Sequence, residues 1–254
     1  MRLALLIACT MPFVAAAECV TRSCSAAAAI TELYTSEGCS SCPPADRWLS
    51  GLKALAGKAT VVPLGFHVTY WDYIGWRDPF ADERNTVRQR ARASASGARY
   101  VYTPQVVVGG RDFRGWRGGG DFERAVEKIN RMPARADLEL RLVPVAGGRL
   151  VVEATAQAGP GVARERLALV VAAVQDGLGS RVTAGENRGE QLRHDFVVRE
   201  FAEVRAFPAS GPATAKATFS PRGGAPAGAL SAVVFVQDLG TGEVLQALAA
   251  PPCH

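Results

Sequence analysis

Residues 30–44 read ITELYTSEGCSSCPP, and this stretch decides the fold. The run from Ala27 to Thr35 is largely apolar and of strand length, so it predicts a buried strand. Ser36-Glu37-Gly38 interrupts the run, because serine and glycine favour turns. Two cysteines separated by two serines follow at once, in Cys39-Ser40-Ser41-Cys42. The cysteine pair is therefore expected at the end of a strand.

A helix is predicted directly after this motif. Between Ser41 and Leu55 the large apolar residues recur at helical spacing, at Trp48, Leu49, Leu52 and Leu55. Pro43 and Pro44 fit a helix only within its first turn, where the backbone N–H groups have no helical partner. The cysteine pair is therefore expected at a junction between a strand and a helix.

Such a junction favours thiol chemistry. A helix N-terminus carries partial positive charge and free N–H groups, which stabilise a thiolate relative to a thiol. The thiolate is the nucleophile in disulfide exchange. We therefore expect Cys39 to have an exposed sulfur that attacks a disulfide, and Cys42, one turn deeper, to resolve the mixed disulfide.

Two other uses of the cysteine pair have to be weighed. Half of a zinc site would require a second pair of cysteines or histidines at ligand spacing, and the sequence has neither. A permanent structural disulfide, which exported proteins often carry, stays open as an alternative.

The first seventeen residues predict export. Arg2 is followed by a mainly apolar stretch, Leu3 to Val14, and then by Ala15-Ala16-Ala17 before Glu18. This pattern is typical of a signal peptide, residues 1–17, cleaved after Ala17. The mature protein is then periplasmic or secreted. No later stretch has about twenty apolar residues in a row, so no membrane-spanning helix is predicted.

Export changes how the cysteines are interpreted. The chain has six of them, at Cys9, Cys19, Cys24, Cys39, Cys42 and Cys253. Cleavage removes Cys9, and Cys39 and Cys42 are natural partners in an oxidising compartment. The remaining three leave two arrangements open. Cys253 pairs with Cys19 or Cys24 and anchors the termini, or Cys19 pairs with Cys24 and Cys253 is free.

The composition is that of an ordinary globular protein. The chain has 254 residues, of which 48% are hydrophobic and 21% charged, and a formal net charge of +5. Its lysines and arginines are scattered, with no basic run interleaved with aromatic residues and no nucleic-acid motif. Nucleic acid is therefore not an expected partner.

The first part of the chain predicts alternating strands and helices. After the helix at 41–55 the pattern gives a strand at 60–68, a helix at 83–95, strands at 101–108 and 112–116, and a helix at 122–131 with Asp121 as its N-cap. The order β-α-β-α-β-β-α is that of a thioredoxin-like α/β domain, which we place at residues 25–134.

The composition changes after Met132-Pro133. Short apolar or alternating runs separated by turns rich in glycine and proline are found at 138–143, 150–156, 167–174 and 230–236. This pattern predicts an all-β, sandwich-like domain over residues 135–254. The runs at 170–176 and 233–238 resemble each other, which favours neighbouring strands.

Pro104 adds independent weight to the fold prediction. In thioredoxin-like folds a cis-proline lies opposite the cysteine pair, and the residue before it positions the backbone of a substrate. Thr103-Pro104 lies where a proline would otherwise damage a strand, and cis peptide bonds are largely confined to proline. A trans proline at a strand edge is the alternative.

The segment 67–82 is rich in aromatic residues and is interpreted as an insertion. His67 is a candidate proton donor or metal ligand near the cysteines, and a hydrogen-bonded structural role is the alternative. Trp71 is a candidate for positioning substrate. Together with Tyr73 and Trp76 it lines a peptide groove or packs between the two domains.

Four stretches together resemble the DUF1223 family of exported bacterial proteins: GCSSCPPAD at 38–46, the aromatic segment at 67–80, VYTPQ at 101–105 and GENRG at 185–189. The chain departs from the family at Thr69, where the family usually has an acidic residue. The resemblance implies a thioredoxin-like domain followed by a β-rich domain. It implies no activity, because the family is named for lacking one, and a fold alone does not specify a function.

The leading hypothesis is a thiol–disulfide oxidoreductase that acts on the thiols or disulfides of exported proteins. Cys39 attacks, Cys42 resolves, and Thr103-Pro104 positions the partner; no organic cofactor is implied. A reductase would need electrons from a membrane donor. The alternative is a non-catalytic binding module, such as a metallochaperone that holds copper(I) between the two cysteines, with His67 as a third ligand. An inert scaffold is the third interpretation.

Overall fold

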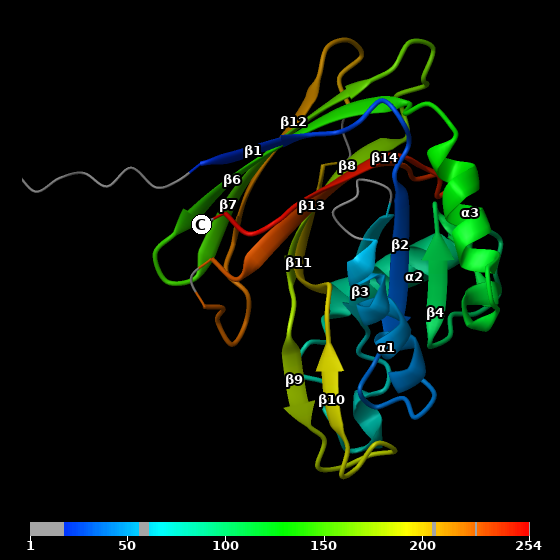
Figure 1. Ribbon diagram of the computed structural model, residues 1–254, viewed down its shortest axis with the longest axis vertical. Helices are drawn as coiled ribbons and strands as arrows, with labels where there is room; N and C mark the ends of the chain where they lie inside the picture. Colours follow the sequence, from blue (N-terminus) through cyan, green and yellow to red (C-terminus); the bar gives the residue numbers. More distant parts are fainter. Residues whose placement is uncertain (1–17, 56–60, 205–206, 227, 254) are drawn as a thin grey trace, which may run out of the picture.

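The computed structural model describes residues 18–55, 61–204, 207–226 and 228–253 (Figure 1). The predicted signal peptide, residues 1–17, lies outside the described residues. The fold is mixed α/β, with an eight-stranded sheet, a four-stranded sheet and a two-stranded hairpin. None of the helices within the described ranges combines the length and the apolar character that crossing a membrane requires.

The eight-stranded sheet joins the two parts of the chain. Its strands follow the order β14 (Val244–Ala250), β13 (Leu230–Asp238), β8 (Leu167–Gln175), β11 (Val197–Val204), β3 (Val61–His67), β2 (Ala29–Thr35), β4 (Gln105–Val108) and β5 (Arg111–Asp112). β3 pairs in parallel with both β2 and β11, and all other pairs are antiparallel. β8 and β13, which contain the two similar runs, are neighbours as expected.

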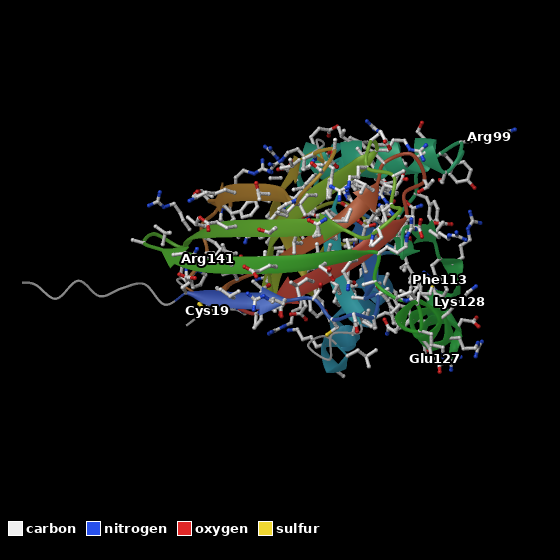
Figure 2. All side chains as sticks on the ribbon, turned by 90° about the horizontal axis from the view of Figure 1, so that it is seen from above. Cys19, Arg99, Phe113, Glu127, Lys128 and Arg141 are labelled. Carbon is white, nitrogen blue, oxygen red and sulfur yellow. A yellow bond between two sulfur atoms is a disulfide. The ribbon has the colours of Figure 1, made fainter. Side chains whose placement is uncertain are left out.

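The four-stranded sheet packs over the β8–β13–β14 end of the larger sheet. It consists of β1 (Cys19–Arg22), β6 (Ala136–Val145), β7 (Arg149–Ala158) and β12 (Ala213–Phe219). The buried apolar residues of both sheets form one core. Figure 2 shows the strands side by side, with the labelled α3 residues at the opposite end from Cys19. β9 (Leu178–Arg181) and β10 (Gln191–His194) form the separate hairpin.

Helices cover both faces of the β2–β3–β4 region. α1 (Pro43–Gly51), which continues into the 3-10 turn Leu52–Ala54, and α3 (Asp121–Asn130) share an apolar cluster with one face. α2 (Glu83–Ala95) packs on the other face. Two further 3-10 turns, Asp72–Ile74 and Arg114–Arg117, lie in the connections.

α2 is held to the sheet by polar contacts. Arg88 is buried and donates to Glu32 of β2, with Nη2 2.6 Å from Oε1. Burial alone would raise the pKa of Glu32, but the guanidinium groups of Arg88 and Arg92 outweigh it and hold that pKa below its usual value. Gln89 donates to the Tyr102 carbonyl at 2.8 Å. Arg88, Glu32 and Gln89, which are all buried, are thus joined to polar partners, as burial favours.

Three element boundaries differ from the predictions. β4 begins at Gln105, after Pro104, because proline has no N–H to contribute to the strand ladder. The predicted strand at 112–116 is wrong beyond Asp112, where Arg114–Arg117 form a 3-10 turn that brings Trp116 against Trp48. Asp121 is the first residue of α3 and not its N-cap, which is Gly120 at φ 84°.

The structure decides between the cysteine pairings. Cys19 and Cys253 form a disulfide with a Cα–Cα distance of 5.8 Å, which joins β1 to the chain just after β14. Cys24 is free and exposed. The termini of the described chain are therefore linked covalently across 234 residues.

Replacing Cys19 and Cys253 together by serine should lower the free energy of unfolding by about 3 kcal/mol, because the unfolded chain regains the freedom that a very long closed loop removes. Chemical denaturation would measure the change. Cys24→Ser is the matched control and should change stability by less than about 0.5 kcal/mol. Equal stability of the double variant and the wild type would contradict the expectation.

Candidate functional site

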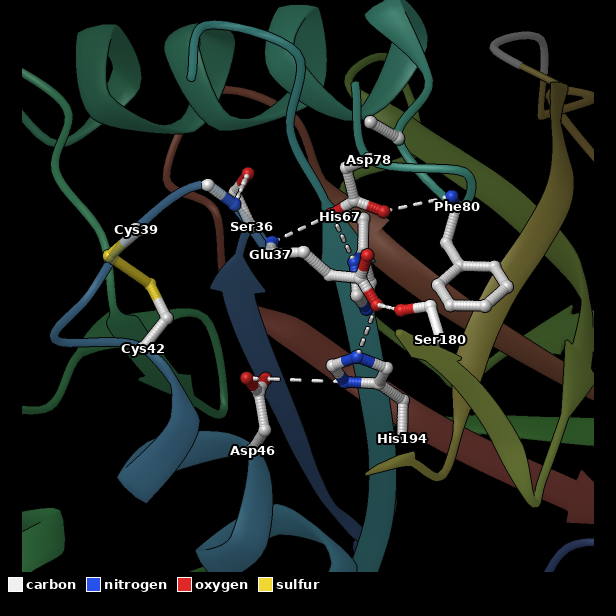
Figure 3. A network of polar contacts seen from close by, with 12 residues as sticks. Ser36, Glu37, Cys39, Cys42, Asp46, His67, Asp78, Phe80, Ser180 and His194 are labelled. Atoms are coloured by element: carbon white, nitrogen blue, oxygen red, sulfur yellow. Dashed lines mark hydrogen bonds and ion pairs between the residues drawn. A yellow bond between two sulfur atoms is a disulfide. The ribbon is translucent and has the colours of Figure 1, made fainter. Parts of the chain in front are cut away.

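The cysteine pair lies at the N-terminus of α1, where the sequence predicts it. Cys39 and Cys42 form a disulfide, and Cys42 is the N-cap residue of the helix. Pro43 and Pro44 occupy the first two helical positions, which need no backbone donor. The helix therefore directs its positive end toward the disulfide (Figure 3).

Both cysteines are fully buried, which contradicts the expectation of an exposed sulfur at Cys39. Ser40 and Ser41 between them are exposed. The Ser41 hydroxyl oxygen lies 3.4 Å from Cys39 Sγ. The disulfide is thus covered, although the two serines between its cysteines are exposed.

Trp71 links the cysteine loop to the predicted substrate-positioning residues. A Cβ atom added at Gly38 would lie 2.9 Å from Trp71 Cβ, so the loop can approach the tryptophan only because residue 38 is glycine. The Trp71 indole Nε1 donates to Thr103 Oγ1 at 2.7 Å. The Thr103–Pro104 peptide bond is cis. Cys39, Trp71 and Thr103 therefore belong to one contiguous site.

A second contact reaches the cysteine loop from the second part of the chain. Asn187 is buried, and its side-chain amide donates to the carbonyl oxygens of Glu37 at 2.8 Å and Cys39 at 3.0 Å. The Glu186 carboxylate accepts from the Ser40 N–H at 3.0 Å. The Ser40 side chain and then this N–H lower the pKa of Glu186. Residues 185–189 therefore act as a clasp on the loop, and we call them the GENRG segment.

The buried Glu37 carboxylate lies at the centre of the surrounding polar network. Trp76 Nε1 donates to Oε2 at 2.9 Å, and His194 Nε2 lies 2.9 Å from Oε1. The Ser180 hydroxyl also donates to Oε1. Trp76 comes from the aromatic segment. Ser180 and His194, which are drawn in Figure 3, come from the two strands of the β9–β10 hairpin. A carboxylate without solvent needs such donors.

His67 pairs with Asp78 inside the same network. His67 Nδ1 lies 2.7 Å from Asp78 Oδ2, and both side chains are buried. Burial alone would lower the pKa of His67, but the Asp78 carboxylate raises it to about 9. The same pairing, with N–H bonds from Glu37 and Phe80, holds the pKa of Asp78 below its usual value against the opposing effect of burial. His67 is thus a charged partner of Asp78 at neutral pH.

Asp46 and His194 face each other across the network, one helical turn beyond Cys42. Asp46 Oδ2 and His194 Nδ1 are 4.0 Å apart, and neither has a hydrogen-bond partner in the described part of the chain. Burial raises the pKa of Asp46 and outweighs the attraction of His194 and His67. Asp46 is therefore a carboxyl group near Cys42 that holds a proton more readily than a solvated one.

The structure thus brings most predicted site residues together and adds others. Cys39, Cys42, Trp71 and Thr103 are joined by contacts, whereas the hydrogen bond of His67 goes to Asp78 and not to a cysteine. The residues that the sequence argument missed are Glu37, Asp46, Asp78, Asn187 and His194. The signals available for them were the position of Glu37 beside the motif and the resemblance at 185–189.

Comparisons with known proteins give a family and a fold. Residues 30–237 match DUF1223, which is described as a protein of unknown function. Among curated proteins, none matches the chain. A crystal structure of a protein from Agrobacterium tumefaciens is 26% identical, with 90% of this chain and 96% of that chain covered and a TM-score of 0.60. HBP35 of Porphyromonas gingivalis is 13% identical, with coverage of 91% and 76% and a TM-score of 0.65, a likeness of fold alone.

The His67–Asp78 pair should make stability depend on pH. A pKa that rises from 6.5 to about 9 on folding stabilises the protein fully below pH 6.5, and this contribution is lost as the pH rises through 9. The shift corresponds to roughly 3 kcal/mol. We expect urea denaturation to give a free energy of unfolding that falls by about that amount between pH 6 and pH 9.5.

His67→Gln provides the control, since glutamine keeps a hydrogen bond to Asp78 but does not titrate. Its stability should vary much less over the same pH range. A wild type and a variant with the same pH slope would show that His67 does not carry the effect.

Proposed function

Because the chain belongs to the DUF1223 family, whose function is unknown, we propose a function from the geometry of its site. The protein is an exported, thioredoxin-like thiol–disulfide oxidoreductase that acts on other exported proteins. The observation that carries the proposal is the Cys39–Cys42 disulfide at the positive end of α1. That position favours the thiolate that exchange requires.

The exchange proceeds through one mixed disulfide in either direction. From the oxidised state, a partner thiolate attacks Cys39 Sγ, the Cys39–Cys42 bond breaks, and Cys42 leaves as a thiolate that takes up a proton. A second thiolate of the partner then attacks the partner sulfur of the mixed disulfide. The bond to Cys39 breaks, Cys39 leaves as a thiolate that takes up a proton, and the partner keeps the new disulfide. Two electrons have then passed from the partner to this protein. In the reverse direction Cys39 attacks a partner disulfide, and Cys42 resolves the product.

The surrounding architecture supports the thioredoxin-like interpretation. β2 and β3 are parallel and joined by α1, and β4 runs antiparallel to β2 on its other side, with α3 on the α1 face. We propose residues 25–134 as this unit and residues 135–254 as a β-sandwich-like unit that supplies the GENRG segment. The chemistry requires no organic cofactor.

Thr103, Pro104 and Trp71 are the proposed positioning residues for a partner chain. Trp71 touches the cysteine loop and hydrogen-bonds to Thr103, so a backbone seated along Thr103 would lie beside the disulfide. We propose that the reaction takes place in the periplasm or outside the cell, as the predicted signal peptide suggests, and that a net reductase would draw electrons from a membrane donor. Because both cysteines are buried, the partner must displace part of the cover.

The copper-chaperone alternative has less support. It needs a third ligand beside the two sulfurs, and His67 was the candidate. Within the described ranges, no group of three or more histidine, cysteine, aspartate or glutamate side chains has an arrangement that could hold a metal ion. His67 Nδ1 is paired with Asp78 in the structure, so we favour exchange as the use of the two cysteines.

Cys42→Ser should trap partners. With the resolving thiol removed, Cys39 is expected to accumulate as mixed disulfides with exported proteins, which appear as high-mass bands on non-reducing gels and collapse on reduction. The variant should be made in a Cys24→Ser background, because Cys24 is free and exposed and would form disulfides of its own.

Cys39→Ser with Cys42→Ser and Cys24→Ser is the matched control and should give no bands. A known oxidoreductase trapped in the same cells shows that the conditions work. If that enzyme yields mixed disulfides and Cys42→Ser yields none, the proposed activity is wrong.

Asn187→Ala should expose the disulfide. The substitution removes two hydrogen bonds that clasp the cysteine loop, each worth about 1 kcal/mol, so loop opening should become at least roughly tenfold more frequent. We expect a corresponding rise in the rate at which dithiothreitol reduces Cys39–Cys42, followed by alkylation. Asn130→Ala on α3 should leave the rate unchanged, and equal rates for Asn187→Ala and the wild type would count against the clasp.

A further inference from the structure

A hollow of about 530 Å³ lies beside the aromatic segment, and no cysteine is among its lining residues. Three parts of the chain line it: residues 77–81, the three residues Gln175, Leu178 and Arg199, and residues 222–224 with Pro226. Its volume is within the usual range of sites for small molecules. The chemistry of its lining indicates what such a molecule would be.

Arg199 brings to the lining a positive charge that has no ion pair within 4.0 Å among the described residues. Its guanidinium group is half-buried and donates to Gln175 Oε1 and to the Arg222 carbonyl oxygen, both of which are neutral acceptors. An arginine has five N–H donors. Among the described residues, no carboxylate lies within 4.0 Å of Arg199, and the remaining three donors have no acceptor within hydrogen-bonding distance.

Two further arginines raise the positive charge of the lining. Arg222 Nη2 lies 3.0 Å from Asp82 Oδ2. Asp82 also pairs with Arg84, so one carboxylate is shared by two guanidinium groups. Arg77 is exposed, and the described residues give it no ion pair.

The acidic residue in the lining, Asp78, does not offset this charge. Its two oxygens already accept from His67 and from the backbone N–H groups of Glu37 and Phe80. Its charge is thus already paired with His67 and is not a free counter-charge for the arginines of the hollow. The lining therefore contains three arginines and one aspartate, and that aspartate is paired with His67.

The rest of the lining is apolar. Pro79, Phe80, Leu178 and Pro226 form its walls. The Arg199 guanidinium lies 5.9 Å from the centre of the Phe80 ring, so the charge and the apolar wall are adjacent. A ligand that satisfies both would carry an anionic group next to an apolar body.

We propose that this hollow binds a small organic carboxylate, with its anionic group on Arg199 and Arg77 and its apolar body against Phe80 and Leu178. The planar guanidinium suits a carboxylate, which can accept two parallel hydrogen bonds. This site goes beyond thiol exchange and does not depend on it, because none of its contacts involves a cysteine.

The electrostatics of Arg199 agree with this site. Burial lowers the pKa of Arg199, and the like charge of Arg222 adds to the effect, whereas Glu200 offsets it in part. Glu200 itself accepts from the Ser220 N–H at 3.0 Å. A bound carboxylate would supply the counter-charge that the described protein groups leave incomplete.

Titration of the isotope-labelled protein with benzoate tests the proposal. We expect saturable shifts of the Arg199 side-chain and Phe80 resonances in NMR spectra, at constant ionic strength. Acetate, which lacks the apolar body, should bind several-fold more weakly, and inorganic phosphate should bind more weakly than benzoate. Absence of saturable benzoate binding, or tighter binding of phosphate, would overturn the proposal.

Variants identify the site. Arg199→Gln should weaken benzoate binding at least tenfold, because a hydrogen bond to a charged group is lost together with the charge. Arg193→Gln, on an exposed residue of β10, is the matched control and should change affinity less than twofold. If Arg199→Gln does not fold, Arg77→Gln at the exposed rim should still weaken binding at least threefold. Unchanged affinity in the folded variants would place the binding elsewhere and reject the site.

Discussion

The site is organised around one constraint, the burial of the Glu37 carboxylate. A desolvated charge is tolerated only when donors surround it, and here they come from Trp76, Ser180 and His194. Its backbone is bound as well, because Asp78 accepts from its N–H and Asn187 donates to its carbonyl. Glu37, two positions before Cys39, thus binds three distant segments: the aromatic segment, the β9–β10 hairpin and the GENRG segment.

This organisation separates two tasks within the molecule. Apolar packing holds the sheets and the helices α1 and α3, whereas polar contacts position the cysteine loop and α2. Polar contacts are directional and lose much of their value when one partner is removed. They therefore set the geometry of the cysteine pair more strictly than apolar packing would, and they keep it covered.

Local features of the sequence were predictable, and distant contacts were not. The bounds of α2, residues 83–95, and the place of Pro43 and Pro44 in the first turn of α1 follow from spacing and backbone chemistry within one segment. The pairing of β11 with β3, the approach of Asn187 to Cys39 and the partner of Glu37 at His194 join residues more than 100 positions apart. A single sequence records periodicity along the chain but not which distant surfaces meet. The polar network around Glu37 and the burial of Cys39 were therefore missed.

The long-range pairings also dictate the order of events while the chain is made. β1 lies against β6, β3 lies against β11, and the partner of Cys19 is Cys253 near the last residue. Contacts between distant segments form slowly because a long loop must close first. Neither sheet can be completed until most of the chain is available. The cysteine loop can therefore acquire its clasp only after residues 185–189 have been made, and the larger sheet can be completed only after β14 has been made.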